Sequence, residues 1–101
     1  MSRDYLGEAR RLSDAGQVGE AILLLEEAVE RGEETAEIAK LLARLSLGID
    51  EVRAFQNWCH EALRMNPKDA EVHEMLAEYF FANGRVAEGR AELAIAKANR
   101  R

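Results

Sequence analysis

Apolar residues recur along this chain at a helical spacing, and short polar turns interrupt it. Near the amino end, Tyr5, Ala9 and Leu12 follow one another at intervals of four and three residues, which is the periodicity of one face of an α-helix. Gly16 can adopt the left-handed conformation that ends such a helix. The pattern therefore predicts a helix, a tight turn and a second helix that begins near Val18.

The same pattern returns when the sequence is shifted by 34 residues against itself. Three columns are then identical in all three copies: Ala9, Ala43 and Ala77; Val18, Val52 and Val86; Ala28, Ala62 and Ala96. The turn column holds Gly16, Asp50 and Gly84, and Pro67 stops the second helix of the middle copy. Self-similarity at this period predicts three helix-turn-helix repeats, 2–35, 36–69 and 70–101, and six antiparallel helices.

The small columns have a physical reason. Two helices of a hairpin approach to about 8–10 Å only where the side chains at their crossing are small, and alanine supplies this in every copy. A second inward column holds Leu25, Cys59 and Leu93. We expect the alanine columns and this second inward column to be buried.

This pattern resembles the tetratricopeptide repeat, a helix-turn-helix unit of 34 residues. The matching residues, beside the Ala28 column, are Ala21, Leu25, Leu42, Ala43, Pro67, Leu76, Ala77, Phe80, Gly89 and Leu93. Tyr5, Ala39 and His73 stand where the family usually has tryptophan. The resemblance implies an all-α fold, a right-handed α-solenoid of three such repeats forming one domain over residues 1–101.

The resemblance also implies that the first helices line a concave groove, which holds an extended or helical segment of a partner protein. The groove residues carried over from the family are Arg10, Lys40, Leu41, Arg44, Leu47, Glu74, Met75, Glu78 and Phe81. They predict a basic amino-terminal half, an acidic carboxy-terminal half and an apolar floor. A bipolar, amphipathic protein or peptide segment would fit such a groove.

Some chaperone-binding members of the family hold a peptide's terminal carboxylate with a clamp of Lys and Asn side chains. The aligned positions here are Leu6, Arg10, Leu41, Glu71 and Met75. Because Glu71 would repel the carboxylate, we do not expect this binding mode.

Composition and charge narrow the classes of partner. The 101 residues are 48% hydrophobic and 33% charged, which suits one globular domain, and the net charge of −5 opposes binding to nucleic acid or to a membrane. An RNA-binding helical repeat is a further functional hypothesis, although the basic patch of Arg3, Arg10, Lys40 and Arg44 lacks interleaved aromatic residues. The single cysteine indicates a reducing, cytoplasmic compartment.

Candidate chemistry is sparse. Cys59, His60 and His73 are the set with metal-ligand character, but we expect Cys59 to be a small buried hydrophobe and predict no metal site. No glycine-rich phosphate loop or nucleophile elbow occurs, so we predict no cofactor, no catalytic residues and no enzyme. Trp58 lies one step off the core stripe and should be partly exposed.

The last predicted helix has a candidate oligomer face. Its outward positions are Ala94, Ile95 and Ala98, preceded by Ala91, and the first two repeats have polar residues at the positions of Ala94, Ile95 and Ala98. Either alanine merely favours the helix, or the face meets a partner. The second reading makes the chain a self-assembling structural module, or a small chaperone-like protein, that oligomerises through its terminal repeats. The chain would then be a fragment of a longer array, or its end would be covered by another copy.

Overall fold

The computed structural model describes residues 3–100, and in this range the chain forms six α-helices and no strand. The helices are α1 (Tyr5–Asp14), α2 (Val18–Glu30), α3 (Ala36–Gly48), α4 (Val52–Met65), α5 (Ala70–Ala82) and α6 (Val86–Ala98). The all-α prediction is confirmed, and the second helices begin at Val18, Val52 and Val86 as the repeat columns predict. Ser2 and Arg101, at the outer limits of the predicted repeats, lie outside the described residues.

Side-chain caps open the first helix of each hairpin. Asp4 accepts a hydrogen bond from the backbone N–H of Gly7 at 2.9 Å, and Thr35 accepts one from Ile38 at 3.2 Å. Asp69 caps α5 by accepting from Glu71 and Val72. These caps satisfy backbone donors that the helix leaves unpaired, so the polar residue before each first helix sets where that helix begins.

Tight turns join the two helices of each hairpin. Gly16 and Gly84 have φ angles of 83° and 74°, and Asp50 occupies the same column with φ of 60°. A left-handed residue at this position reverses the chain directly after the helix. The middle hairpin therefore uses an aspartate for a conformation that glycine provides in its neighbours.

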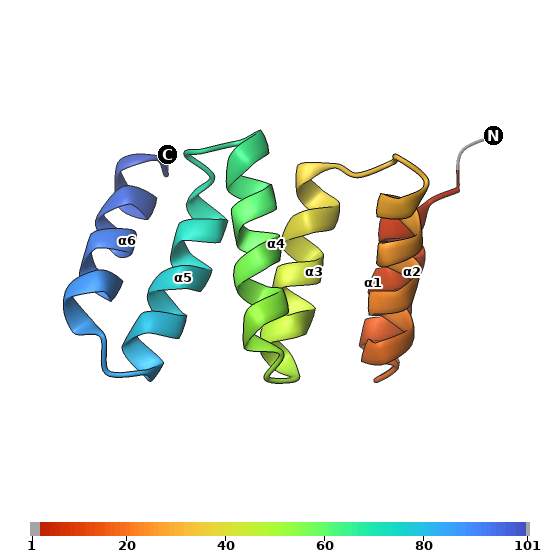
Figure 1. The fold of residues 1–101 in the computed structure, drawn as a ribbon, viewed down its shortest axis with the longest axis horizontal. Helices are drawn as coiled ribbons and strands as arrows, with labels where there is room; N and C mark the ends of the chain where they lie inside the picture. The colour runs from red at the N-terminus through yellow and green to blue at the C-terminus, as the bar shows by residue number, and fades with distance from the viewer. Residues whose placement is uncertain (1–2, 101) are drawn as a thin grey trace.

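The three hairpins stand side by side in chain order, with the two chain ends toward opposite ends of the row (Figure 1). The principal extents of 43 × 24 × 22 Å describe an elongated molecule. This is a helical repeat solenoid. None of the helices in residues 3–100 is both long enough and apolar enough to cross a lipid bilayer.

The core consists of two clusters that meet at α3. One cluster joins α1, α2 and the face of α3 that carries Leu42, and the other joins α4, α5 and the face of α3 that carries Ala43. Trp58 is half-buried and packs against both clusters. α3 is consequently the helix through which the first hairpin is held to the rest of the molecule.

The alanine columns are buried, which confirms their predicted place at helix crossings. The buried members are Ala9, Ala28, Ala43, Ala62, Ala77 and Ala96. In the second column Leu25 and Cys59 are buried, but Leu93 is only half-buried. The expectation for Leu93 was wrong because no further helix covers α6 within the part of the chain that the structure describes.

Candidate functional site

The first helices of the three hairpins share a hollow of about 270 Å³. It is lined by Arg10 of α1, by Glu37, Lys40, Leu41 and Arg44 of α3, and by Glu71 of α5. Four of the predicted groove residues, Arg10, Lys40, Leu41 and Arg44, thus line one surface, although they come from two different hairpins.

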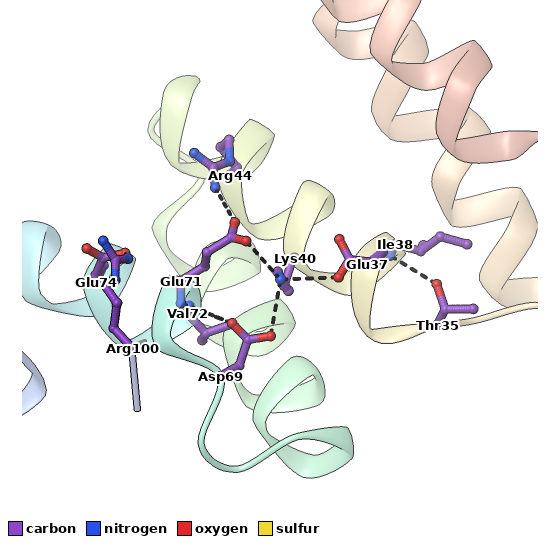
Figure 2. Close-up of polar contacts among 10 residues, drawn as sticks. All are labelled: Thr35, Glu37, Ile38, Lys40, Arg44, Asp69, Glu71, Val72, Glu74 and Arg100. Carbon is purple, nitrogen blue, oxygen red and sulfur yellow. Dashed lines mark hydrogen bonds and ion pairs between the residues drawn. The ribbon is translucent and has the colours of Figure 1, made fainter. Parts of the chain in front are cut away.

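Lys40 is buried in this hollow and is surrounded by carboxylates (Figure 2). Its Nζ lies 3.1 Å from Asp69 Oδ2, 3.2 Å from Glu37 Oε1 and 3.3 Å from Glu71 Oε1. Burial by itself lowers the pKa of a lysine, but the hydrogen bonds to these carboxylates outweigh it and raise the pKa of Lys40. The charge of Lys40 is therefore already matched within the protein.

The Lys40 contacts correct the sequence analysis, which placed this side chain at the open surface of the groove. Lys40 is only 7% exposed, and its partner Asp69 also caps α5. Its physical role is to tie the middle of α3 to the start of α5. Of the three partners of Lys40, Asp69 is the buried one, and an incoming acidic group that displaced it would leave a buried carboxylate without its cation, which is costly.

Arg44 is placed differently, because it is exposed. Its Nη2 donates to Glu71 Oε2 at 3.2 Å, and more than half of each side chain is open to solvent. Such an exposed pair contributes little to stability. Arg44 can exchange Glu71 for an acidic group of another molecule at small cost.

Arg10 is the cation of the hollow that forms no ion pair with any residue in 3–100. It projects from α1, is exposed, and lies beside the half-buried Leu41. The hollow therefore offers an unpaired positive charge next to an apolar side chain.

Two further predicted groove residues, Leu47 and Glu78, line a second hollow of about 320 Å³. Tyr79 and Val52 add apolar surface to it. Glu78 is exposed and forms no ion pair with any of residues 3–100. This second hollow lies between the ends of α3 and α5 and has an acidic and apolar lining.

Phe81 is 40% exposed at the end of α5. Its ring lies over Gly89 of α6, where a Cβ atom would come within 2.8 Å of the ring carbons. The absence of a side chain at Gly89 lets the ring lie close against α6, and the remaining ring surface faces solvent.

Met75 and Glu74 differ from their expected roles. Met75 is only 5% exposed and belongs to the core cluster that contains Phe55 and Val72, so it does not form part of an open floor. Glu74 pairs with Arg100, just beyond α6 (Figure 2). Among the predicted groove residues, Arg10 and Glu78 are thus the charges without an ion-pair partner in residues 3–100, and the groove does not have two fully charged halves.

The residues with metal-ligand character are not brought together. Cys59 is buried, which confirms its expected packing role, and burial raises the pKa of its thiol to about 12. His60 is exposed, whereas His73 is buried against Glu92 and the carbonyl of Pro67. Among residues 3–100 no group of three or more His, Cys, Asp or Glu side chains is arranged to hold a metal ion.

The outward face of α6, the candidate oligomer face predicted from the sequence, is exposed. Ile95 is 40% exposed, and it lies beside Ala91, Ala94 and Ala98 on the outward face of α6. Ala96, on the opposite side of the helix, is buried.

Sequence reasoning did not find Asp69 or Glu71 as partners of the groove cations. Asp69 could be recognised as a helix cap, because it directly precedes the helix that begins at Ala70. Its ion pair with Lys40 depends on how two hairpins stack, and a repeat period alone does not reveal that contact.

This architecture defines a class: an α-helical repeat protein whose first helices share an open, charged and apolar surface. Two sequence models of the tetratricopeptide repeat match the chain, one over residues 12–79 and the other over residues 58–101. The chain belongs to the tetratricopeptide repeat family, whose repeats generally mediate protein–protein interaction. A comparison with curated proteins found no match.

Proposed function

We propose that this protein is a non-catalytic interaction module that binds a segment of a partner protein along α1, α3 and α5. The proposal rests on Arg10, which is exposed and forms no ion pair with any of residues 3–100. Arg10 lies beside Leu41 in a hollow to which all three first helices contribute. The proposal keeps the cytoplasmic location expected from the single cysteine.

The chemistry of the surface suggests what the segment contains. An acidic group meets Arg10, and Arg44 joins it by releasing Glu71. Apolar side chains of the partner lie on Leu41, Leu47 and the exposed part of Phe81, and a basic group meets Glu78. Affinity comes mostly from the apolar contacts, while the charges set orientation and association rate.

A charge-reversal variant tests the groove without disturbing the fold. Arg10→Glu combined with Glu78→Lys alters two exposed residues that have no ion pair within residues 3–100, and leaves the net charge unchanged. Tagged wild-type protein and tagged variant are compared in affinity capture from a lysate of the source cells, followed by titration of the captured partner. We expect the variant to bind the partner at least tenfold more weakly, because both ends of the segment then face like charges.

The matched control is Glu30→Lys combined with Arg90→Glu, on α2 and α6. Both residues lie on second helices, away from the groove, and the net charge is again unchanged. The control should retain the partner that the groove variant loses. Equal capture of the same partners by all three proteins would contradict the groove assignment.

Self-assembly is the second candidate, and the exposure of Ile95 on α6 favours it. In this alternative the chain is a structural module or a small chaperone-like protein whose copies meet through Ala91, Ala94, Ile95 and Ala98. Sedimentation over a wide range of protein concentration tests it: the mass should rise with concentration, and Ile95→Asp should abolish the rise. A monomer at all concentrations would contradict it.

A further inference from the structure

A third hollow, of about 290 Å³, is formed largely by second helices, whereas the groove is formed largely by first helices. We call it the Trp58 hollow. Its apolar lining consists of Ile22 and Leu23 of α2, Ile49 of the α3–α4 turn, and Ala54 and Trp58 of α4. It shares no lining residue with either groove hollow, and most of its surface comes from the second helices of the first two hairpins.

The Trp58 hollow exposes more apolar surface than folding requires. Leu23 is 68% exposed and Ile49 is 47% exposed, and they lie within one hollow beside the half-buried Trp58. Large apolar side chains scattered singly on a surface need no explanation, but a contiguous group is typical of a contact site.

The repeat supplies an internal comparison. At the next junction, one period later, the positions of Ile22, Leu23, Ile49, Ala54 and Trp58 are held by Gln56, Asn57, Asn83, Glu88 and Glu92. All five apolar residues are replaced there by polar ones, yet the third hairpin has the same helices and the same turn. The repeat fold is therefore built without apolar side chains at these positions. Ile22 and Trp58 pack against the core here, but Leu23 and Ile49 are exposed, so their apolar character at the first junction has another cause.

The charges around the hollow restrict its occupant. Glu26 and Glu51 line it, no lysine or arginine does, and neither carboxylate forms an ion pair with a residue in 3–100. The net charge of −5 adds to the negative potential at this surface. A volume of about 290 Å³ is at the small end for small-molecule sites and is suited to one or two side chains.

We propose that the Trp58 hollow is a second docking site, which receives a helical or extended segment of a partner protein carrying one large apolar side chain flanked by lysine or arginine. The apolar side chain enters between Leu23, Ile49 and Trp58, and the flanking basic groups pair with Glu26 and Glu51. This partner chemistry differs from that of the groove, whose unpaired cation calls for an acidic group. The module would then hold two different segments at two sites.

A peptide-library selection on the purified protein tests the proposal. A displayed library of random 15-residue peptides is selected on wild-type protein and depleted on Leu23→Asn/Ile49→Asn, which carries the residues the repeat itself uses one period later. Circular dichroism and thermal unfolding first verify that the variant is folded. We expect enriched peptides with a large apolar residue between basic ones.

Trp58 is the only tryptophan of the chain, so its fluorescence reports directly on occupancy. An enriched peptide should shift the Trp58 emission saturably. Its affinity should fall at least tenfold for Leu23→Asn/Ile49→Asn, and should fall for Glu26→Gln/Glu51→Gln and with added salt. The groove variant Arg10→Glu/Glu78→Lys should bind it unchanged, which separates this site from the proposed groove.

Three results would overturn the proposal. One is the absence of peptides that prefer wild type over the asparagine variant. Another is enrichment of acidic peptides. The third is a concentration-dependent mass of the free protein that Leu23→Asn/Ile49→Asn abolishes, since a second copy of the chain would then occupy the hollow.

Discussion

At the scale of single residues, Asp50 shows how one position can carry backbone strain. Its φ of 60° is left-handed, and the equivalent residues Gly16 and Gly84 adopt this region without a Cβ atom. We expect Asp50→Gly to raise the free energy of unfolding by about 0.5–1 kcal/mol, because relief of the left-handed strain exceeds the extra chain entropy of glycine. Urea denaturation measures this change.

The reciprocal exchange is the control for Asp50. Gly84→Asp should lower the free energy of unfolding by a similar amount, since it places the same strain in the third hairpin. A loss of stability in Asp50→Gly would show that the aspartate side chain holds the turn in some other way.

His73, on α5, is buried between two hydrogen-bond acceptors. Its Nδ1 lies 2.6 Å from Glu92 Oε2 and its Nε2 lies 2.9 Å from the Pro67 carbonyl oxygen. Two acceptors favour the ring with both nitrogens protonated. Burial alone would lower the pKa of His73, but these hydrogen bonds and the Glu92 charge raise it above its usual 6.5.

The raised pKa of His73 determines whether the free energy of unfolding rises or falls with pH. Its stabilising contribution is full below about pH 6.5, the pKa in the unfolded chain, and is lost as the pH rises through the higher folded-state pKa. We expect the difference in unfolding free energy between wild type and Glu92→Gln to be large at pH 6 and to shrink toward pH 9. Urea denaturation across this range measures it.

The control for His73 is His60→Gln, which changes an exposed histidine on α4. Its stability should run parallel to that of wild type across the same pH range. A difference between wild type and Glu92→Gln that stayed constant with pH would mean that His73 is neutral in the folded protein.

Part of the candidate site can be predicted from the sequence. Arg10 and Leu41 could be placed on one surface from the repeat period and the family resemblance. The burial of Lys40 and Met75 could not be predicted, because neither the repeat period nor the family resemblance reveals how tightly neighbouring hairpins stack. Asp69 lies in a later turn, and its approach to Lys40 is a consequence of that stacking.

At the scale of elements, the link between α3 and α5 depends on Lys40 and Asp69. Both side chains are at most 10% exposed and lie 3.1 Å apart. We expect a double-mutant cycle with Lys40→Met and Asp69→Asn to give a coupling energy of about 1–3 kcal/mol, because buried charges that lose their partner are costly. Unfolding free energies of the four proteins measure it.

The neighbouring exposed pair is the comparison for that cycle. Arg44→Met and Glu71→Gln should couple by less than about 1 kcal/mol, since solvent already satisfies both charges. Equal coupling in the two cycles would argue that Lys40 is more solvated than its burial indicates.

Helices and turns were the part of the fold that sequence predicted best. The starts at Val18, Val52 and Val86, and the end of α4 before Pro67, follow from local periodicity, turn residues and proline. Leu93 was misjudged because its burial depends on a neighbour beyond α6 and not on its own helix. The local sequence pattern thus determines where the helices begin and end, while the burial of side chains on the outermost helices depends on whether another helix packs against them.

At the scale of the whole molecule, packing is uneven along the row of hairpins. α3 buries Ile38, Ala39, Lys40, Leu42, Ala43, Leu45 and Ser46, whereas α1 buries only Tyr5 and Ala9 and α6 only Gly89 and Ala96. In a repeat array each unit is stabilised mainly by its neighbours, so the outer helices gain less than the central one.

This gradient predicts the order in which the molecule opens. In native-state hydrogen exchange, we expect amides in the middle of α1 and α6 to exchange at least tenfold faster than those of α3, because partial opening releases the outer helices first. Both proposed surfaces include α3 or its following turn, so part of each site would stay on the most stable part of the array, whereas Arg10 of the groove lies on α1, which opens early. Uniform protection of all helices would instead show a molecule that opens only as a single unit, in which the position of a site along the row would have no bearing on its stability.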